Sequence, residues 1–342
     1  MASNTTKALT RVLLSGAGGS GSIEMIRTLK ETGHYRIVAV DASPYAFGLK
    51  LADAGYVVPM ATATEFKPAI ETIIAQEKPG YLIPLVDEEI LACHDIAARS
   101  GVKVIAPTPE FCRLSLDKWL TWQALRTAGI ATPSTWLGTE NLDRIKYPAV
   151  IKPRWGRGSR GVAYLHRAEE LKKYLGNAPE EPQNYVIQSL IEGKEYTVSA
   201  VVGLDGAILA VVPKEIITKR GITLVGVTRR APTIEALCRQ IQERLQANGP
   251  FNVQLVDDDS GQPHVIEINP RYSTTVALTI AAGVHEVDIV IRHAQGEPVP
   301  TPIKFVPDLM MIRYHTQEYI PETQWSFSHP EPGQKSDRER SE

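Results

Sequence analysis

The chain has 342 residues, of which 43% are apolar and 22% charged, as in ordinary globular proteins. Lys and Arg total 37 against 39 Asp and Glu, a net charge of -2, so the basic excess of a nucleic-acid surface is missing. We find no secretory signal and no apolar run near the roughly 20 residues that a membrane helix needs, and three scattered cysteines predict neither a disulfide framework nor a zinc site. We therefore expect a cytoplasmic protein of two or three domains that acts without nucleic acid or membrane.

Short apolar strands alternate with helical patterns in residues 1–109. Strands are expected at 12–15, 36–40, 56–58, 81–85 and 103–105, and helices at 22–32, 66–77 and 88–99. Such alternation predicts a doubly wound parallel sheet that is covered on both faces. Pro107 and Pro109 mark the end of this domain.

A glycine cluster, Gly16 to Gly21, fits the pattern G-x-G-x-x-G between the first strand and the first helix. Asp41 lies 20 residues beyond Gly21, as in a dinucleotide-binding fingerprint. The same glycines serve equally well in a first turn that only needs tight packing. Later motifs place nucleotide binding elsewhere, so we expect this turn to hold at most an anion such as a substrate carboxylate.

Residues 110–300 have a different pattern, with antiparallel strands and fewer helices. Asp117 can cap a helix that runs to Ala128, and Asp205-Gly206 is a strong signal for a hairpin turn. We predict an α+β domain with a small lid-like subdomain at about 133–190. An extension at 301–320 is expected to pack on the core, and the polar composition of 321–342 predicts a disordered tail.

Lys152 and the glycine-rich loop that follows it suggest a phosphate site. A buried strand would place the Lys152 ammonium inward, and the loop Gly156-Arg157-Gly158-Ser159-Arg160-Gly161 offers backbone amides and guanidinium groups. An exposed loop of ordinary basic content is the alternative. The next strand, near Gln188, could present its backbone to an adenine edge, although a strand pair with a glutamate at position 195 is commonplace.

Polar residues at fixed spacing in the third quarter of the chain suggest a metal site. Strand alternation puts Glu267 and Asn269 on one face, and Gln254 lies on the preceding strand. Carboxylate and amide oxygens are ligands that suit Mg²⁺, which shares its remaining positions with phosphates. Arg271 lies two residues further on and can steady charge on a transferring phosphoryl group. A hairpin whose polar residues face solvent is the alternative.

Taken in order, these motifs resemble the ATP-grasp superfamily, in particular the carbamoyl phosphate synthetase large-chain branch. The resemblance covers about residues 110–296, and the first domain resembles the pre-ATP-grasp domain of such enzymes. The matching segments are Asp117-Lys118, Lys152-Pro153 with its loop, Ser189-Leu190-Ile191 with Glu195, Asn252-Val253-Gln254, and Glu267 to Arg271.

The resemblance implies an ADP-forming carbon–nitrogen ligase that uses ATP and Mg²⁺, with Mn²⁺ able to substitute. Lys118 and Lys152 would hold the phosphates under the Gly156–Gly161 loop. Gln188, Ser189, Leu190 and Ile191 would meet the adenine, and Glu195 the ribose. Glu267, Asn269 and Gln254 would bind the metal, with Arg271 and Lys152 catalytic. Gln188 departs from the Glu that relatives often carry, and Lys118 stands where that branch often has Arg.

We predict that a small-molecule carboxylate becomes an acyl phosphate that an amine then captures, on an amino acid or small peptide. Asp87 and Glu88 are candidates for a substrate amine, and Arg220 and Arg230 for a carboxylate, although helix-terminal acids and an exposed basic loop explain them equally well. Carbamoyl phosphate synthetase-like activity, a nucleotide-binding module and a nicotinamide-dependent oxidoreductase are the alternatives. A homodimer is left open.

Overall fold

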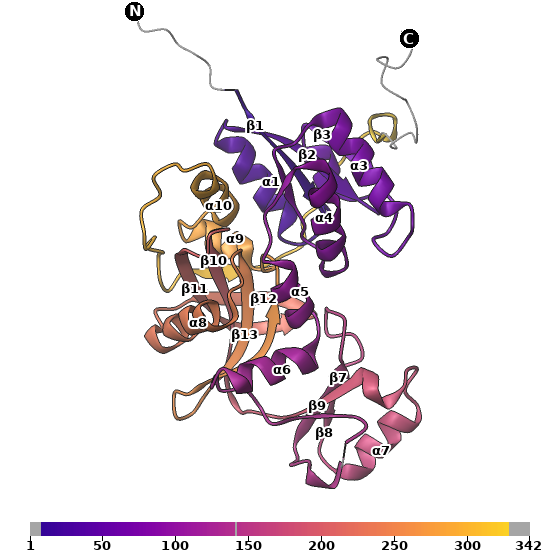
Figure 1. The fold of residues 1–342 in the computed structure, drawn as a ribbon, viewed down its shortest axis with the longest axis vertical. Helices are drawn as coiled ribbons and strands as arrows, with labels where there is room; N and C mark the ends of the chain where they lie inside the picture. The colour runs from indigo at the N-terminus through magenta and orange to yellow at the C-terminus, as the bar shows by residue number, and fades with distance from the viewer. Residues whose placement is uncertain (1–7, 141, 328–342) are drawn as a thin grey trace, which may run out of the picture. The chain divides into compact units, whose positions relative to one another are not determined.

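A computed structural model describes residues 8–140 and 142–327 of the chain. It divides the chain into two compact units, each described here by itself. The first unit contains the residues up to Ile105 together with those from Thr316 onward, and the second contains Ala106–His315. Figure 1 shows the elements of both units.

The first unit is built on a five-stranded parallel sheet with the strand order β3-β2-β1-β4-β5. The strands are β1 (Thr10–Ser15), β2 (Tyr35–Asp41), β3 (Ala54–Val57), β4 (Tyr81–Ile83) and β5 (Lys103–Val104). The helices are α1 (Ser22–Glu31), α2 (Phe47–Leu51), α3 (Phe66–Glu77) and α4 (Asp87–Ser100). The predicted doubly wound parallel sheet is therefore confirmed.

Helices α3 and α4 bury one face of this sheet. Phe66 and Ile70 of α3 and Ile96 of α4 pack with Leu13 and Val38 of the sheet. Figure 1 shows α1 on the other side of the sheet from α3 and α4. Helix α2 was not predicted, because a five-residue helix is too short to show an amphipathic period.

The second unit contains a six-stranded sheet with the order β14-β13-β10-β11-β12-β15, in which all neighbouring strands are antiparallel. Its strands are β10 (Gly193–Val202), β11 (Ile208–Arg220), β12 (Ile222–Thr228), β13 (Phe251–Asp258), β14 (Pro263–Asn269) and β15 (Met310–Ile312). The helices of this part are α5 (Pro109–Ser115), α6 (Lys118–Thr127), α8 (Pro232–Leu245), α9 (Val276–Ala281) and α10 (Glu286–Ala294). The expected antiparallel α+β region is thus confirmed.

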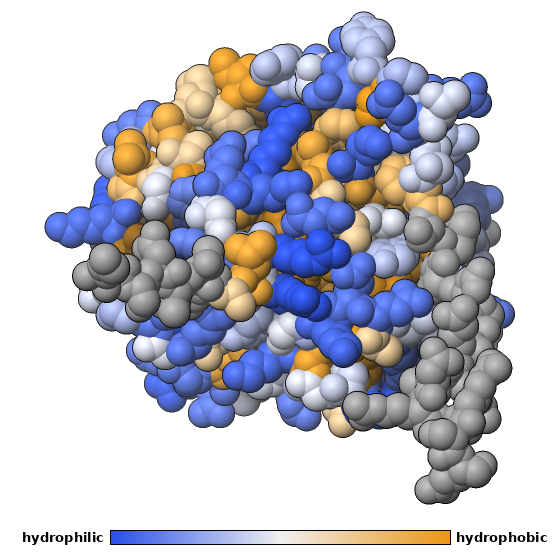
Figure 2. All heavy atoms as spheres, turned by 90° about the horizontal axis from the view of Figure 1, so that it is seen from above, coloured by the Kyte–Doolittle hydropathy of each residue, from blue (hydrophilic) through white to orange (hydrophobic). Residues whose placement is uncertain are grey.

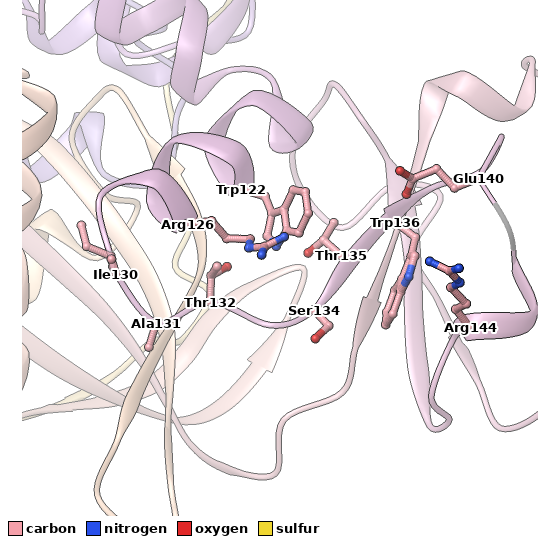
Figure 3. Close-up of a pocket in the computed structure, with 11 residues that line it drawn as sticks. Trp122, Arg126, Ile130, Ala131, Thr132, Ser134, Thr135, Trp136, Glu140 and Arg144 are labelled. Carbon is pink, nitrogen blue, oxygen red and sulfur yellow. The ribbon is translucent and has the colours of Figure 1, made fainter.

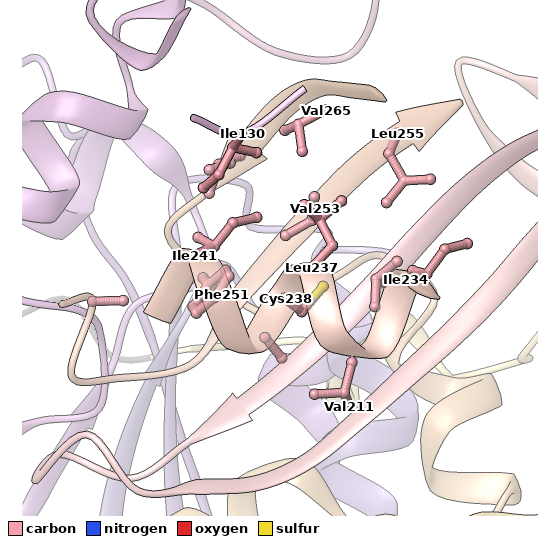
Figure 4. Close-up of a cluster of buried hydrophobic side chains, with 14 of the residues drawn as sticks. Ile130, Val211, Ile234, Leu237, Cys238, Ile241, Phe251, Val253, Leu255 and Val265 are labelled. Atoms are coloured by element: carbon pink, nitrogen blue, oxygen red, sulfur yellow. The ribbon is translucent and has the colours of Figure 1, made fainter. Parts of the chain in front are cut away.

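The main core of this unit lies between α8 and the six-stranded sheet. Figure 4 shows Ile234, Leu237 and Ile241 of α8 facing Val253 and Phe251 of β13. These side chains are at most 7% exposed, so their burial supplies the hydrophobic stabilisation that holds the polar face of the sheet in place.

A four-stranded antiparallel sheet with the order β6-β9-β7-β8 forms a smaller part of the same unit, with a core of its own. Its strands are β6 (Thr135–Leu137), β7 (Ala149–Pro153), β8 (Ala163–Leu165) and β9 (Tyr185–Ser189), with α7 (Ala168–Gly176) packed on one face. Ile151, Leu171 and Ile187 form its small core, which leaves Lys152 on the opposite face. The short helices η1 (Leu142–Arg144) and η2 (Pro182–Asn184) connect its strands.

Two expectations need correction. Arg220 was predicted to meet a substrate carboxylate, with an exposed basic loop as the alternative, but it is the last residue of β11 and pairs with Ile222 of β12. The segment from residue 321 was expected to be a disordered tail, but it begins with the short helix η3 (Glu322–Gln324), and the Trp325 indole donates to Pro44 O at 2.9 Å. Two aromatic residues of this segment, Trp325 and Phe327, pack against each other. The rest of the expected tail, residues 328–342, lies outside the described residues.

The molecular surface is polar over most of the face drawn in Figure 2, where apolar residues occur in small separate groups. Among the described residues, no helix is long and apolar enough to cross a membrane.

Candidate active site

A cleft in the second unit collects most of the charged residues that the sequence singled out. Lys118, Lys152, Glu267, Asn269 and Arg271 line it. Both lysines are nearly buried, at 8% and 6% exposure, although lysine is rarely buried without a partner. Residues from α6, β7 and β14, far apart in the sequence, therefore meet in one place.

The helix cap of α6 fixes the position of Lys118. The Asp117 carboxylate accepts hydrogen bonds from Trp119 N and Leu120 N, which confirms the predicted cap. Arg154 pairs with the same carboxylate at 2.7 Å, and Lys118 N donates to Arg154 O. These contacts, called here the Asp117–Arg154 lock, join the start of α6 to the end of β7. Arg154, which precedes the predicted phosphate loop, therefore has a structural role.

The glycine-rich loop after β7 closes one side of the cleft. Gly156, Gly158 and Ser159 have positive φ values of 109°, 71° and 58°, a backbone conformation that glycine adopts at little cost. The Lys118 ammonium donates to Gly156 O at 2.8 Å. Arg157, Arg160 and Gly161 complete the loop, and the Tyr174 hydroxyl donates to Gly161 O.

The positive charges of the cleft exceed its negative charges. Burial lowers the pKa of Lys152 to about 8, with Glu267 opposing the shift and Lys118 adding to it. The nearest acceptor given for the Lys152 ammonium is Ile266 O at 3.5 Å, while Lys118 lies 3.6 Å from the Glu267 carboxylate. The Glu267 carboxylate is thus the single nearby negative charge given for two buried ammonium groups. A bound polyanion would neutralise the remaining positive charge.

The predicted metal ligands lie side by side on adjacent strands. Gln254 of β13 is directly opposite Glu267 of β14, and Asn252 is opposite Asn269. All four line the cleft, and their oxygens are of the kind that Mg²⁺ prefers. Arg271 follows at the end of β14, where one guanidinium nitrogen lies 3.4 Å from Asn269 Oδ1.

Glu195 also lines the cleft, near the β11–β12 turn. Its carboxylate pairs with Lys219, and the Lys219 side chain reaches the cleft from β11. An acidic side chain on the rim, already oriented by a cation, can accept hydrogen bonds from hydroxyl groups such as those of a ribose.

The predicted adenine residues are placed less simply. The Gln188 side chain is buried and donates to Thr135 Oγ1 at 3.0 Å. Ser189 N donates to Ser134 O and Leu190 N to Pro148 O. Of the segment Gln188 to Ile191, no residue is among those that line the cleft, and its amide and backbone groups already have these protein partners. The adenine contacts stay a prediction.

Two of the predicted substrate residues, Arg220 and Arg230, do not line the cleft. Arg220 is exposed at the β11–β12 turn, and Arg230 lies over the Phe305 ring at 4.2 Å, near Glu235. Neither is among the residues that line the cleft. Asp87 and Glu88 form the first turn of α4 in the first unit.

Several residues that line the cleft were missed. Thr197 accepts from the Asn252 amide at 2.7 Å and lies 3.4 Å from Ser273 Oγ. Strand alternation could have found Asn252 and Thr197, since each lies two residues from a predicted site residue on the same strand. Thr223 and Thr274 also line the cleft, but nothing in their local sequence marks them.

One backbone amide of the Gly16–Gly21 turn donates to a side chain of the same unit. Gly18 N donates to Asp41 Oδ2 at 2.7 Å, and Ser43 N donates to Asp41 Oδ1 at 2.8 Å. The carboxylate that would read a ribose therefore caps its own loop. This geometry favours the interpretation of the glycines as packing residues over a dinucleotide site.

Comparison with known proteins bears on both units. Residues 12–105 match the PylC-like N-terminal domain, and residues 115–275 match the ATP-grasp domain. The carbamoyl phosphate synthase large chain of Xanthomonas axonopodis pv. citri is 26% identical over 286 residues, which cover 75% of this chain and 26% of that protein. The chain thus spans about a quarter of the length of this relative.

Solved structures share the fold at low sequence identity. Biotin carboxylase from Campylobacter jejuni, in a β-γ-ATP complex, has a TM-score of 0.72 and 18% identity, with coverage of 89% of this chain and 74% of that one. An L-amino acid ligase from Bacillus licheniformis has a TM-score of 0.68 and 16% identity, with coverage of 88% and 78%. The chain thus contains a segment that matches the ATP-grasp domain, residues 115–275, behind a segment that matches the PylC-like N-terminal domain, residues 12–105.

Proposed function

We propose that the protein is an ATP-dependent carboxylate–amine ligase that works through an acyl phosphate and releases ADP and phosphate. The observation that carries this proposal is the cleft in which two nearly buried lysines share one nearby carboxylate, Glu267, beside the amide side chains of Gln254 and Asn269. The phosphates of a magnesium triphosphate would pair with the two lysines, and its Mg²⁺ would bind the carboxylate and amide oxygens.

The residues present fit such a ligand. Glu267, Asn269 and Gln254 would hold Mg²⁺, and Mn²⁺ has similar preferences for oxygen. Lys118 and Lys152 would pair with phosphate oxygens under the Gly156–Gly161 loop. When bound, the metal neutralises phosphate charge and orients the reacting phosphoryl group.

The residues of the chain would contribute alignment and charge rather than covalent catalysis. Lys152 is held rigidly by its strand and Lys118 by its helix cap, so little reorganisation is needed as charge develops. Arg271 would stabilise the phosphoryl and acyl-phosphate groups beside Asn269. The amine then displaces phosphate from the acyl carbon, which forms the amide bond.

The substrate class in this proposal is an amino acid or small peptide, and the solved L-amino acid ligase has the same fold. A screen of amino-acid pairs for phosphate release, with mass detection of the products, tests it. A product heavier by one amino acid and dependent on Mg²⁺ and ATP is expected. Nucleotide turnover that no amine or carboxylate changes would contradict the proposal.

Carbamoyl phosphate synthetase-like activation of bicarbonate is the second candidate, favoured by the match to the large chain of that enzyme. ADP release that requires bicarbonate and proceeds without an amino acid would support this candidate over the first.

A further inference from the structure

A second cavity of about 770 Å³ lies in the same unit, apart from the cleft. Its walls come from α6, from the segment Gly129–Thr135 and from the residues around β6, the edge strand of the four-stranded sheet. Figure 3 shows Trp122 and Arg126 on one side of it, and Trp136 and Arg144 on the other. Of the described residues, none lines both cavities.

Helix α6 borders both cavities through one of its faces. Lys118, Trp122 and Arg126 follow at intervals of four residues, so they lie on the same side of the helix. Lys118 lines the cleft, whereas Trp122 and Arg126 line the second cavity. A molecule in the second cavity would therefore contact the helix that presents Lys118.

The cavity has more guanidinium than carboxylate groups. Arg126 and Arg144 are exposed, and within residues 8–140 and 142–327 neither has an ion-pair or hydrogen-bond partner. Arg126 lies 4.9 Å from the centre of the Trp122 ring. Glu140, the carboxylate of the lining, already accepts from Leu137 N at 3.0 Å. The two arginines can thus receive an anion from outside the chain.

Two half-buried indole rings complete the lining. Trp136 offers ring surface to a ligand, whereas the Trp122 ring already stacks on Trp119 at 4.6 Å and lies under Arg126. The buried Trp122 Nε1 has no hydrogen-bond acceptor within the described part of the chain, which is unusual for a buried donor. Flat ring surface between two guanidinium groups is an arrangement suited to a ligand that is both planar and anionic.

We propose that this cavity binds a small organic anion that carries a flat ring. The ring stacks on the indole of Trp136, the anionic group pairs with Arg126 on the opposite wall, and Arg144 adds positive charge on the side of Trp136 (Figure 3). An aromatic carboxylate and a nucleoside monophosphate share this chemistry. The site is separate from the cleft and goes beyond the proposed ligase activity.

The segment Gly129–Thr135 connects a wall of this cavity to both sheets. Ala131 O accepts from Val265 N at 2.9 Å, and Thr132 Oγ1 donates to Val265 O at 2.8 Å, on the strand that carries Glu267. Ser134 O accepts from Ser189 N at the end of β9. One wall of the cavity is therefore hydrogen-bonded to both sheets.

Calorimetric titration of the whole protein, with the cleft saturated by MgADP, tests this site. Indole-3-acetate and adenosine 5′-monophosphate are the two probes, so the arms distinguish a carboxylate from a nucleotide ligand. Saturable binding of at least one probe is expected. Arg126→Gln should weaken it about tenfold or more, since it removes a charge-assisted hydrogen bond, and Arg144→Gln should weaken it by a smaller factor, since it removes positive charge from the cavity.

Two control variants make the outcome specific. Arg244→Gln removes an exposed arginine of α8 outside the cavity and should leave probe affinity unchanged. Lys152→Met should abolish nucleotide binding in the cleft but not probe binding, so the two proposals can fail independently. The inference is overturned if neither probe binds more tightly than about 1 mM, or if the Arg126 and Arg144 variants bind as the wild type does.

Discussion

At the scale of single residues, Lys152 is the most informative group of the cleft. Its ammonium is buried on β7 and shares the Glu267 carboxylate with Lys118, so burial lowers its pKa from 10.5 to about 8. Phosphate oxygens beside it would favour the charged form and raise this pKa again. Nucleotide binding should therefore be coupled to a change in the protonation of one lysine.

We predict that MgADP binding takes up protons between pH 8 and 9. At pH 8 the free protein holds about half a proton on Lys152 and the complex about one, so binding takes up about half a proton. Uptake grows toward pH 9 and vanishes well below pH 8, where Lys152 is already protonated. Affinity accordingly falls as the pH rises above 8. Calorimetry in buffers of different ionisation enthalpy measures the uptake.

Lys152→Arg separates this effect from other titrating groups, because arginine stays protonated throughout this range. Uptake in that variant should drop toward zero while some nucleotide affinity remains. Lys214, whose pKa burial also lowers to about 8, lies outside the cleft lining and is unchanged in this variant. Equal proton uptake in the variant and the wild type would show that Lys152 does not meet the nucleotide.

Glu267 makes a second residue-scale prediction. Glu267→Gln keeps the shape of the side chain but removes the charge that faces Lys118 and would hold the metal. Turnover in saturating ATP and Mg²⁺ should fall by roughly 10²-fold, with an unchanged unfolding transition. Glu243→Gln, an exposed carboxylate on α8, is the matched control. Wild-type turnover in Glu267→Gln would refute the metal assignment.

At the scale of elements, the start of α6 depends on one buried carboxylate. Asp117 caps the helix and pairs with Arg154, and it is only 4% exposed. Asp117→Ala removes the cap and leaves Arg154 partly buried without its partner. We expect a loss of about 3 kcal/mol in the free energy of unfolding, measured by urea denaturation.

The neighbouring pair Glu110 and Arg113 provides the control for this prediction. Their side chains are 80% and 61% exposed, so Glu110→Ala should change the unfolding free energy by less than about 0.5 kcal/mol. Similar effects of the two substitutions would mean that the Asp117–Arg154 lock contributes little. If Asp117→Ala raises the nucleotide KM and Glu110→Ala does not, the Asp117–Arg154 contact also positions Lys118.

Elements with strong local signals could be predicted from the sequence, and those that depend on tertiary partners could not. The parallel strands of the first unit and the Asp205-Gly206 hairpin follow from apolar runs and turn residues. Strand β12 was not predicted, because the basic sequence Lys219-Arg220-Gly221 before it is typical of a loop. Its pairing with β11 and β15 stabilises it as a strand. The partner of the Gln188 side chain, Thr135, could not be predicted either, because the pairing of β6 with β9 brings it in.

At the scale of the whole molecule, the ordered set of motifs predicted the match to the ATP-grasp domain. Single motifs were less informative about the contacts that their own residues make. Lys118, Lys152 and Glu267 line one cleft as expected, although they come from helix α6 and from two different sheets. Arg220 and Arg230, predicted to meet the substrate carboxylate, do not line that cleft. Arg230, for example, packs on Phe305, since local charge alone does not say which side of a sheet a loop covers.

The last prediction decides which unit holds the nucleotide. A ligand that binds only the folded state stabilises it by about 2.7 kcal/mol at a hundredfold excess over Kd, so MgADP should raise the melting temperature by several degrees. Lys152→Met should abolish this rise. Asp41→Asn weakens the hydrogen bonds of the Gly16–Gly21 turn, so it can lower the melting temperature without ligand, but the rise should persist. A rise that is lost in Asp41→Asn and kept in Lys152→Met would place the nucleotide at the first βα turn instead.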